Sequence, residues 1–393
     1  MTKKNCNPYF HLALSAYCIV TFLSLDMYLP ALPSMARDLG LGEHAIQYTI
    51  TIWFLGSASL QFFLGPIADY IGRKPVFLWG IVLFIASSLL LATTTSYHWI
   101  LLGRFVQGAT VCSTMVAGMA TIHTVYSGRK AVQVMAVFST ITILAPALGP
   151  LLGAVVLYAY GWQVIFFCLA LAATVSLFVH GVMMPETREA DSSLQLSVVC
   201  RQYIALLFHS LFMRFVLVNV LLTSVFFMWI VESPFIIIDK LDKGPFSFGL
   251  VQIPIFAAFI LGGQITKYFA TRVAIDRLVL IGILIALGAS LLLALEAWLA
   301  QPLSYIITTM TLLALGAAMT WGPLSRYAIV VSDAATGSKV ALSSAMTSIS
   351  GVVSSTVLGL FDNFTFWDLS LPMIVACFMA SVIFIYADKP SLD

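Results

Sequence analysis

Residues 64–94 read LGPIADYIGRKPVFLWGIVLFIASSLLLATT, a charged turn followed by a long apolar run. No charged side chain occurs between Val76 and Thr94, and the run approaches the roughly 20 residues that an α-helix needs to cross a bilayer. The preceding turn carries Asp69, Arg73 and Lys74. The stretch therefore predicts a transmembrane helix with a charged loop at one end.

The whole chain has the composition that such helices require. Its 393 residues are 61% hydrophobic and 9% charged, whereas a soluble domain is about a quarter charged. The predicted fold class is an all-α integral membrane protein with twelve transmembrane helices. Apolar runs place the spans near residues 10–35, 45–67, 75–94, 98–122, 131–158, 162–183, 212–236, 246–270, 275–298, 302–323, 338–360 and 369–387.

One polar stretch divides the predicted spans into two sets of six. We expect an N-terminal six-helix bundle over residues 1–185, a cytoplasmic central linker over 186–211 and a C-terminal six-helix bundle over 212–393. The two halves are weakly similar in sequence. LGPIADYIGRK at 64–74 and GGQITKYFATR at 262–272 share Gly, Ile and Tyr at matching positions. Repeated bundles are typical of secondary transporters.

The distribution of positive charge predicts the orientation. With the N-terminus inside, all but four of the 19 Lys and Arg residues fall on the cytoplasmic side, the exceptions being Arg37, Arg104, Lys240 and Lys243. Since loops rich in these residues stay in the cytoplasm, we expect both termini there. A net charge of +2 gives no electrostatic footprint for nucleic acid, and the six cysteines have no C-x-x-C spacing that would indicate a metal site or disulfide.

The charged loop between spans two and three can hold neighbouring helix ends together. Asp69 can cap a helix or pair with a cation, and loss of that contact would let two bundles move apart. The alternative is an ordinary charged turn. The loop resembles the signature of the major facilitator superfamily, whose glycine, aspartate, glycine, arginine and lysine positions are met by Gly65, Asp69, Gly72, Arg73 and Lys74.

Three further stretches resemble the twelve-span drug:proton antiporters of the Bcr/CflA and MdfA type within that superfamily. Residues 101–108, LLGRFVQG, are similar to the family's buried arginine followed by glycine. Residues 145–154, APALGPLLGA, resemble its antiporter motif, with alanine replacing glycine at both ends. Residues 25–33, LDMYLPALP, resemble span one. The resemblance implies two pseudo-symmetric six-helix bundles, the major facilitator fold, and multidrug/H+ antiport by alternating access.

Two ionisable side chains inside apolar spans need a partner or a function, because a charge at mid-membrane costs on the order of 3 kcal/mol. Asp26 is the candidate proton carrier, since a carboxyl group in apolar surroundings can alternate between protonated and ionised forms. Arg104 keeps its proton, so we expect it to modulate that carboxyl group or to hold buried carbonyls and water. The alternative for both is a static structural ion pair.

Glu232, close to Pro234 near the outer end of span seven, is a third candidate for proton coupling. It can attract cationic substrates as a second acidic site, or it can simply face water at the membrane surface. Members of the MdfA type have a second acidic residue on span one where this chain has Cys18. The sequence therefore departs from the family pattern at the position tied to dicationic drugs.

Span five contains Pro146, Gly149, Pro150 and Gly153. Proline removes a helix donor and glycine permits close backbone contact, so this span is expected to be bent and tightly packed. The resemblance makes these four residues the antiporter motif, whose packing would seal a leak path. A kinked helix without special function is the alternative.

A substrate cavity is expected to be lined by aromatic and flexible apolar side chains. The candidates are Phe22, Tyr48, Met115, Trp229 and Phe256. The alternative for each of them is that it faces lipid or packs in the protein interior.

The sequence thus predicts a proton-coupled secondary transporter that exports lipophilic or cationic small molecules. We expect a monomer in the inner membrane that uses no cofactor and no metal, with protons as the coupling ion. Export of an endogenous metabolite or siderophore, and proton-coupled uptake, remain alternatives. An enzyme is not expected, because the spans contain no H-E-x-x-H, no G-x-S-x-G and no paired aspartates.

Overall fold

The computed structural model describes residues 9–126, 128–187, 196–299, 302–361 and 365–390, and for residues 123, 128–129, 131–132, 135–144 and 296–297 it describes the backbone only. Within these residues every regular element is a helix. Ten helical segments are long and apolar enough to cross a membrane, and a bent pair makes up to eleven. The predicted all-helical membrane fold is confirmed, and a helix lies at each of the twelve predicted positions.

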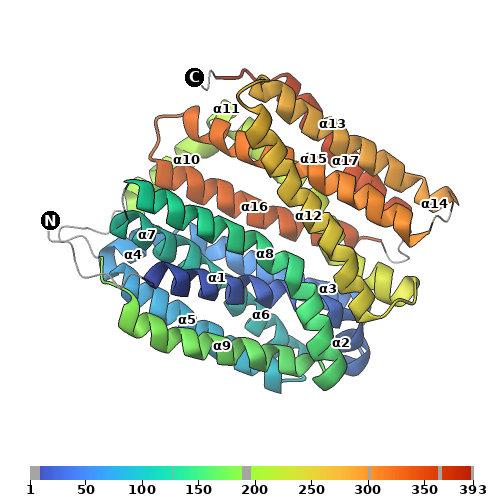
Figure 1. Ribbon diagram of the computed structural model, residues 1–393, viewed down its shortest axis with the longest axis horizontal. Coiled ribbons are helices and arrows are strands. Elements are labelled where there is room, and N and C mark those ends of the chain that lie inside the picture. Colours follow the sequence, from blue (N-terminus) through green and yellow to red (C-terminus); the bar gives the residue numbers. More distant parts are fainter. Residues whose placement is uncertain (1–8, 127, 188–195, 300–301, 362–364, 391–393) are drawn as a thin grey trace. The chain divides into compact units, whose positions relative to one another are not determined.

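The chain divides into two compact units, Met1–Val199 with Lys243–Gly249, and Cys200–Asp242 with Leu250–Asp393. In the first part of the chain, the helices are α1 (Phe10–Asp26), η1 (Leu29–Ala31), α2 (Leu32–Leu39), α3 (Glu43–Gln61), α4 (Leu64–Ile71), α5 (Arg73–Thr93), α6 (Tyr97–Ser113), η2 (Thr114–Gly118), α7 (Met119–Val125), α8 (Gly128–Tyr160) and α9 (Trp162–Met183). Figure 1 shows α1 beside α8 and α9, and α5 beside α9.

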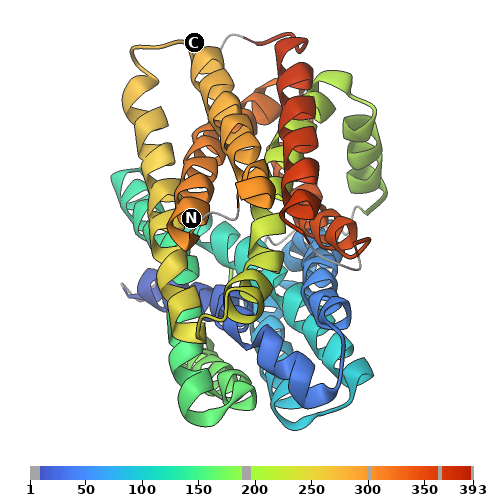
Figure 2. The same ribbon diagram turned by 90° about the vertical axis from the view of Figure 1, so that its right-hand side faces the viewer.

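The later part of the chain begins with α10 (Leu196–Leu207), a helix inside the stretch predicted as linker, of which residues 188–195 lie outside the described part. It continues with α11 (Ser210–Pro234), η3 (Phe235–Lys240), α12 (Pro245–Phe269), α13 (Ile275–Ala294), α14 (Glu296–Leu299), α15 (Leu303–Val330), α16 (Thr336–Leu358) and α17 (Phe366–Ile385). Here α11 packs against α15, α16 and α17, and α13 packs against α15 and α17. Figure 2 shows α13, α15 and α17 from the side, in orange and red.

The first two spans are interrupted, and proline explains both interruptions. Span one extends to Leu39, beyond the predicted residue 35, and its α-helix stops at Asp26 before a short 3₁₀ turn that contains Pro30. Pro30 has no N–H for the carbonyl of Asp26. Span two bends by 51° between α3 and α4, where Pro66 cannot donate to the carbonyl of Phe62.

Glycine brings some helices into backbone contact. A Cβ atom on Gly56 of α3 would lie 2.1 Å from the carbonyl oxygen of Phe105, and one on Gly108 of α6 would lie 2.0 Å from that of Trp53. Small residues permit such close approach in membrane proteins. The contact fixes α3 and α6 as a closely packed pair that positions Arg104 on α6.

Candidate functional site

Asp26 is the last residue of α1 and is 4% exposed. Its side chain therefore lies at the point where the helix breaks, next to the 3₁₀ turn that carries Pro30. In the described part of the chain, no hydrogen bond or ion pair involves this carboxyl group.

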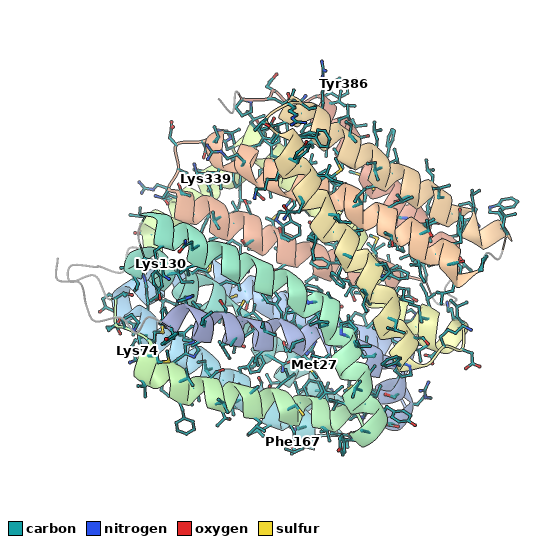
Figure 3. All side chains as sticks on the ribbon, viewed as in Figure 1. Met27, Lys74, Lys130, Phe167, Lys339 and Tyr386 are labelled. Carbon is teal, nitrogen blue, oxygen red and sulfur yellow. The ribbon has the colours of Figure 1, made fainter. Side chains whose placement is uncertain are left out.

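Helix α8 packs directly against Asp26 and the residue after it. A Cβ atom on Gly149 would lie 2.4 Å from Cβ of Asp26, and one on Gly153 would lie 2.0 Å from the carbonyl oxygen of Met27. Figure 3 labels Met27 beside this helix. Pro146 and Pro150 lie inside the same continuous helix. Of the four residues of the predicted antiporter motif, Gly149 and Gly153 thus meet the α1 break, and Pro146 and Pro150 belong to the same helix.

Arg104 is completely buried on α6. Its Nη1 donates to the carbonyl oxygen of Ser24, at 2.8 Å, and to Oε1 of Gln107, at 2.6 Å. Its guanidinium carbon lies 4.4 Å from the centroid of the Tyr28 ring, a cation–π contact. Arg104 therefore holds a backbone carbonyl two residues before Asp26 and the ring two residues after it.

No ion pair joins Asp26 to Arg104 in the described chain. The Nε and Nη2 atoms of Arg104 also lack a hydrogen-bond partner there. The static ion pair that the sequence left open is thus not formed in this structure. The two residues are instead connected through the backbone of α1.

Four polar side chains around Arg104 received no role from the sequence. Nε2 of Gln107 donates to Oγ of Ser88 on α5, at 3.0 Å, and the hydroxyl groups of Tyr28 and Thr49 are hydrogen-bonded at 2.7 Å. This network ties α5, α6, α3 and the α1 break together. Gln107 lies three residues after Arg104 and Tyr28 lies two residues after Asp26, inside the motifs quoted for spans four and one. This closeness in sequence to the two charged residues could have identified them.

The loop between α4 and α5 forms contacts with two other helices. Arg73 donates to Oδ1 of Asp69, at 3.1 Å from Nη2, and its Nη1 donates to the carbonyl oxygen of Ala120, at 3.0 Å, and to the hydroxyl of Thr124 on α7, at 2.5 Å. Nζ of Lys74 donates to the carbonyl oxygen of Gly181 on α9, at 2.7 Å. The predicted loop residues therefore connect helix ends within the first unit.

Gly72 is the residue that joins α4 to α5. Its φ of 120° is strained for other residues, and a Cβ atom there would lie 3.0 Å from Oε2 of Glu186. The absence of a side chain lets the Glu186 carboxylate approach the loop. Gly65 is less constrained, because the nearest side-chain atom to a Cβ there is Cγ1 of Val116, at 3.8 Å.

Glu232 on α11 is 2% exposed and does not face open solvent in this structure. Trp229, one turn earlier, is fully buried and its Nε1 donates to Oε1 of Gln252 on α12, at 3.3 Å. Nε2 of Gln252 donates in turn to Oγ of Ser233, at 3.3 Å. Glu232 is therefore flanked by a polar network inside the second unit.

The other predicted cavity residues differ in their surroundings. Tyr48 is 44% exposed, Phe22 and Met115 are partly buried, and Phe256 packs edge to face with Phe226 at 5.6 Å between ring centroids. A small pocket in the second unit is lined by other residues, namely Asn219, Leu222, Thr223, Phe226, Phe259, Ala317 and Trp321. No group of three or more metal-ligating side chains occurs among the described residues.

Comparisons with known proteins agree on one family. The Major Facilitator Superfamily profile matches residues 14–355. The chloramphenicol resistance protein CraA of Acinetobacter baumannii is 29% identical over 361 residues, which cover 91% of this chain and 87% of CraA. The multidrug transporter MdfA of Edwardsiella ictaluri is 31% identical over 277 residues, 70% of this chain and 67% of that protein.

The fold also matches a solved structure. A bacterial homologue of the human lysosomal transporter Spinster, in an inward-facing and unoccupied conformation, superposes with a TM-score of 0.75 over 98% of both chains. Its sequence identity is 14%, so this likeness bears on the fold alone.

Proposed function

This chain belongs to the Major Facilitator Superfamily, and we propose that it exports small molecules across a membrane in exchange for protons. Membership confirms the resemblance found in the sequence. It also confirms that the chain is a transporter and not an enzyme. The proposal adds three points to family membership: coupling to protons, the direction of transport and the class of substrate.

The buried carboxyl group of Asp26 is the observation that carries the proposal. It lies at a helix break, has no hydrogen-bond or ion-pair partner in the described chain, and meets the backbone of α8 at Gly149. Burial disfavours the ionised form of an acid, and water or a cationic substrate favours it. Asp26 can therefore release its proton when one of these ligands reaches it.

Competition between a proton and the substrate for Asp26 would couple export of the substrate to import of protons. An ionised Asp26 attracts a cationic or polar substrate, and protonation weakens that attraction, so the proton and the substrate exclude each other. Arg104 remains charged in both states and holds the Ser24 carbonyl, which keeps the α1 break in one geometry while Asp26 titrates. The transport step is alternating access by two bundles, residues 1–185 and 212–393, joined by a linker over 186–211.

We assign lipophilic or cationic small molecules as substrates. CraA is named for chloramphenicol resistance and MdfA for multidrug transport, and this chain covers most of both. The burial of the candidate carboxyl groups supports this class, because Asp26 is 4% exposed and Glu232 is 2% exposed. The protein is proposed to act as a monomer in the inner membrane with both termini in the cytoplasm.

The charged loop is proposed to close the inner side during the cycle. The contacts of Arg73 with Ala120 and Thr124, and of Lys74 with Gly181, join this loop to α7 and α9. A substitution at Asp69 would remove the carboxylate that orients Arg73. The substitution would then shift the balance between the state that is open to the inside and the state that is open to the outside.

Flux in membrane vesicles tests the proposal. Vesicles containing the protein are given an imposed proton gradient and a panel of cationic, neutral and siderophore-like compounds. We expect accumulation of cationic or lipophilic compounds against their gradient, with proton movement in the opposite direction. Proton movement in the same direction as the compound would establish uptake, and transport that ignores the proton gradient would reject coupling.

Glu232 is proposed to favour cationic substrates. In Glu232→Gln we expect the apparent affinity for a cationic compound to fall by about tenfold, as for loss of one charged contact, with the affinity for a neutral compound unchanged. Binding to the purified protein measures both affinities. Asp239→Asn, an exposed acid of the following η3, is the control. Equal losses for the cationic and neutral compounds would contradict the proposal.

A further inference from the structure

Span four changes its helical form part-way along. Helix α6 ends at Ser113, η2 is a single turn of π-helix over Thr114–Gly118, and α7 continues from Met119. In a π turn residue i bonds to residue i+5, so the turn holds one residue more than an α turn. Such turns are frequent at functional sites, and sharp bends in helices occur at them. Span four therefore consists of two α-helical segments that meet at a turn where a helix bends readily.

The first of these segments, α6, is fixed to its neighbours through backbone. Gly108 of α6 and Gly56 of α3 bring the backbones of these two helices into direct contact. Nη1 of Arg104 donates to the carbonyl oxygen of Ser24 on α1, at 2.8 Å. Movement of α6 would therefore disturb both its packing on α3 and its hold on α1.

The second segment, α7, is fixed to the charged loop between α4 and α5 instead. Nη1 of Arg73 donates to the carbonyl oxygen of Ala120 and to Oγ1 of Thr124, and Nη2 of Arg73 donates to Oδ1 of Asp69. Hydrogen bonds from a charged donor are stronger than those between neutral groups. Any movement of the loop would therefore draw α7 with it, whereas these bonds do not reach α6.

The π turn between the two segments carries an unpaired buried hydroxyl group. On either side of it, Ser113 and Thr121 each donate to a backbone carbonyl of the preceding turn, at 2.7 and 2.8 Å. Thr114 is fully buried as well, yet its Oγ1 has no hydrogen-bond partner in the described chain. An unpaired buried hydroxyl costs free energy. The turn is therefore less stable than the α-helix before and after it.

The contacts of the turn are looser than the contact between α6 and α3. A Cβ atom on Gly118 would meet a side-chain atom, Cδ1 of Leu14 on α1, at 2.8 Å. A Cβ atom on Gly65 of α4 would still lie 3.8 Å from Cγ1 of Val116. A leucine side chain can change its rotamer, whereas a backbone carbonyl cannot. The surroundings of η2 therefore permit it to bend.

We propose that η2 is a hinge that lets α7 move with the charged loop while α6 keeps Arg104 in place. The inference rests on the proposed role of that loop in closing the inner side. The extra residue and the unpaired hydroxyl of Thr114 make the turn the place where span four bends. The inner end of the span can then follow the loop without a shift of the Arg104 contacts.

Hydrogen–deuterium exchange of the full-length protein tests the hinge. We expect the backbone N–H groups of residues 114–118 to exchange about tenfold faster than those of residues 101–113. Thr114→Val replaces the unpaired hydroxyl with a methyl group and should slow exchange in the turn by about tenfold. Thr121→Val is the matched control, because it removes a buried hydroxyl that has an acceptor, so exchange should stay the same or become faster. Equal exchange in the turn and in α6, or the same effect of both substitutions, would overturn the proposal.

A one-residue deletion tests the extra residue of the turn. Deletion of Val116 should close the turn as α-helix with α6 and α7 still facing their partners, so we expect a folded protein that transports more slowly. Deletion of Val82 removes the same residue type from the unbroken helix α5 and turns one half of it by about 100° against the other, so we expect folding to be lost. Equal loss of folding in both deletions would contradict the proposal. Exchange and folding are measured without substrate or proton gradient, so proton exchange can fail while the hinge stands.

Discussion

Arg104 is a buried cation that has no carboxylate within ion-pair distance in the described chain. It is held by the Ser24 carbonyl, the Gln107 amide and the Tyr28 ring. A planar guanidinium can serve all three at once, whereas an ammonium is a point charge. This arrangement makes Arg104 a positioning residue for the α1 break that carries Asp26.

Arg104→Lys keeps the positive charge but removes the planar guanidinium, so it separates the effect of the charge from the effect of the side-chain shape. We expect transport to fall by tenfold or more and the free energy of unfolding to drop by about 1–3 kcal/mol, because two hydrogen bonds and the ring contact are lost. Transport in vesicles and thermal unfolding measure the two effects. Arg214→Lys is the control, since Arg214 also donates to a backbone carbonyl but is exposed. Normal transport by Arg104→Lys would show that the guanidinium shape is not needed.

The sequence identified Asp26 and Arg104 as charges inside the spans but not the polar side chains around Arg104. Asp26 and Arg104 could be found because a charge in an apolar run is rare and costly. Gln107, Ser88 and Thr49 could not, because a neutral polar residue in a span carries no comparable penalty. Lys339 was predicted only as a cytoplasmic loop cation, whereas its buried Nζ donates to the carbonyl oxygens of Ile329 and Ser332 at the end of α15.

Among the elements, α1 and α8 form the contact on which the candidate site depends. Gly149 and Gly153 are four residues apart on α8, so they share one face, and that face meets Asp26 and Met27. The break in α1 exposes the carbonyl of Met27 to this face. Close packing of the two helices therefore limits how far Asp26 can move without a shift of α8.

Gly153→Ala tests this packing. Its added methyl group would lie 2.0 Å from the carbonyl oxygen of Met27, which is backbone and cannot rotate away. We expect a loss of about 1–3 kcal/mol in the free energy of unfolding, the range for overpacked sites, together with a loss of transport. Gly288→Ala on α13 is the control, because nothing lies within 4 Å of its added Cβ atom. Equal stability of the two variants would contradict the close contact.

The sequence predicted where helices occur better than where they break. Long apolar runs mark a span because the bilayer requires about 20 residues. Pro30 and Pro66 were visible, but proline can sit in a membrane helix that merely bends, so it does not by itself fix the break at Asp26 or the 51° angle between α3 and α4. Helix α10 lies in a stretch whose charges indicated only a linker.

At the scale of the molecule, the positive-inside pattern predicts that the linker and both termini are cytoplasmic. The exposed thiol of Cys200 on α10 offers a direct test. A membrane-impermeant maleimide should label Cys200 in inside-out vesicles and leave it unlabelled in right-side-out vesicles. Cys200→Ser identifies the signal, because Cys168, the other cysteine that is exposed among the described residues, and Cys6, outside them, would remain. Labelling of Cys200 from the outside would reverse the predicted orientation.

A repeated organisation stays a prediction, made from the similarity between residues 64–74 and 262–272 and from the polar stretch between the sets of spans. The structure divides the chain near that stretch, at Val199 and Cys200, and adds Lys243–Gly249 to the first unit. This segment includes the two residues before α12 and the first five residues of α12. No local sequence pattern distinguishes it from the rest of its loop and helix. Contacts between residues far apart in sequence decide such an assignment.

Proton release on substrate binding is the most direct test of the exchange mechanism. A cationic substrate is added to purified protein in weakly buffered detergent solution near neutral pH, and a pH indicator records protons while a separate binding signal records occupancy. We predict release from the unaltered protein, and none from Asp26→Asn, which lacks the acid that would lose the proton. Binding without release by the unaltered protein, or equal release by Asp26→Asn, would contradict proton exchange at Asp26.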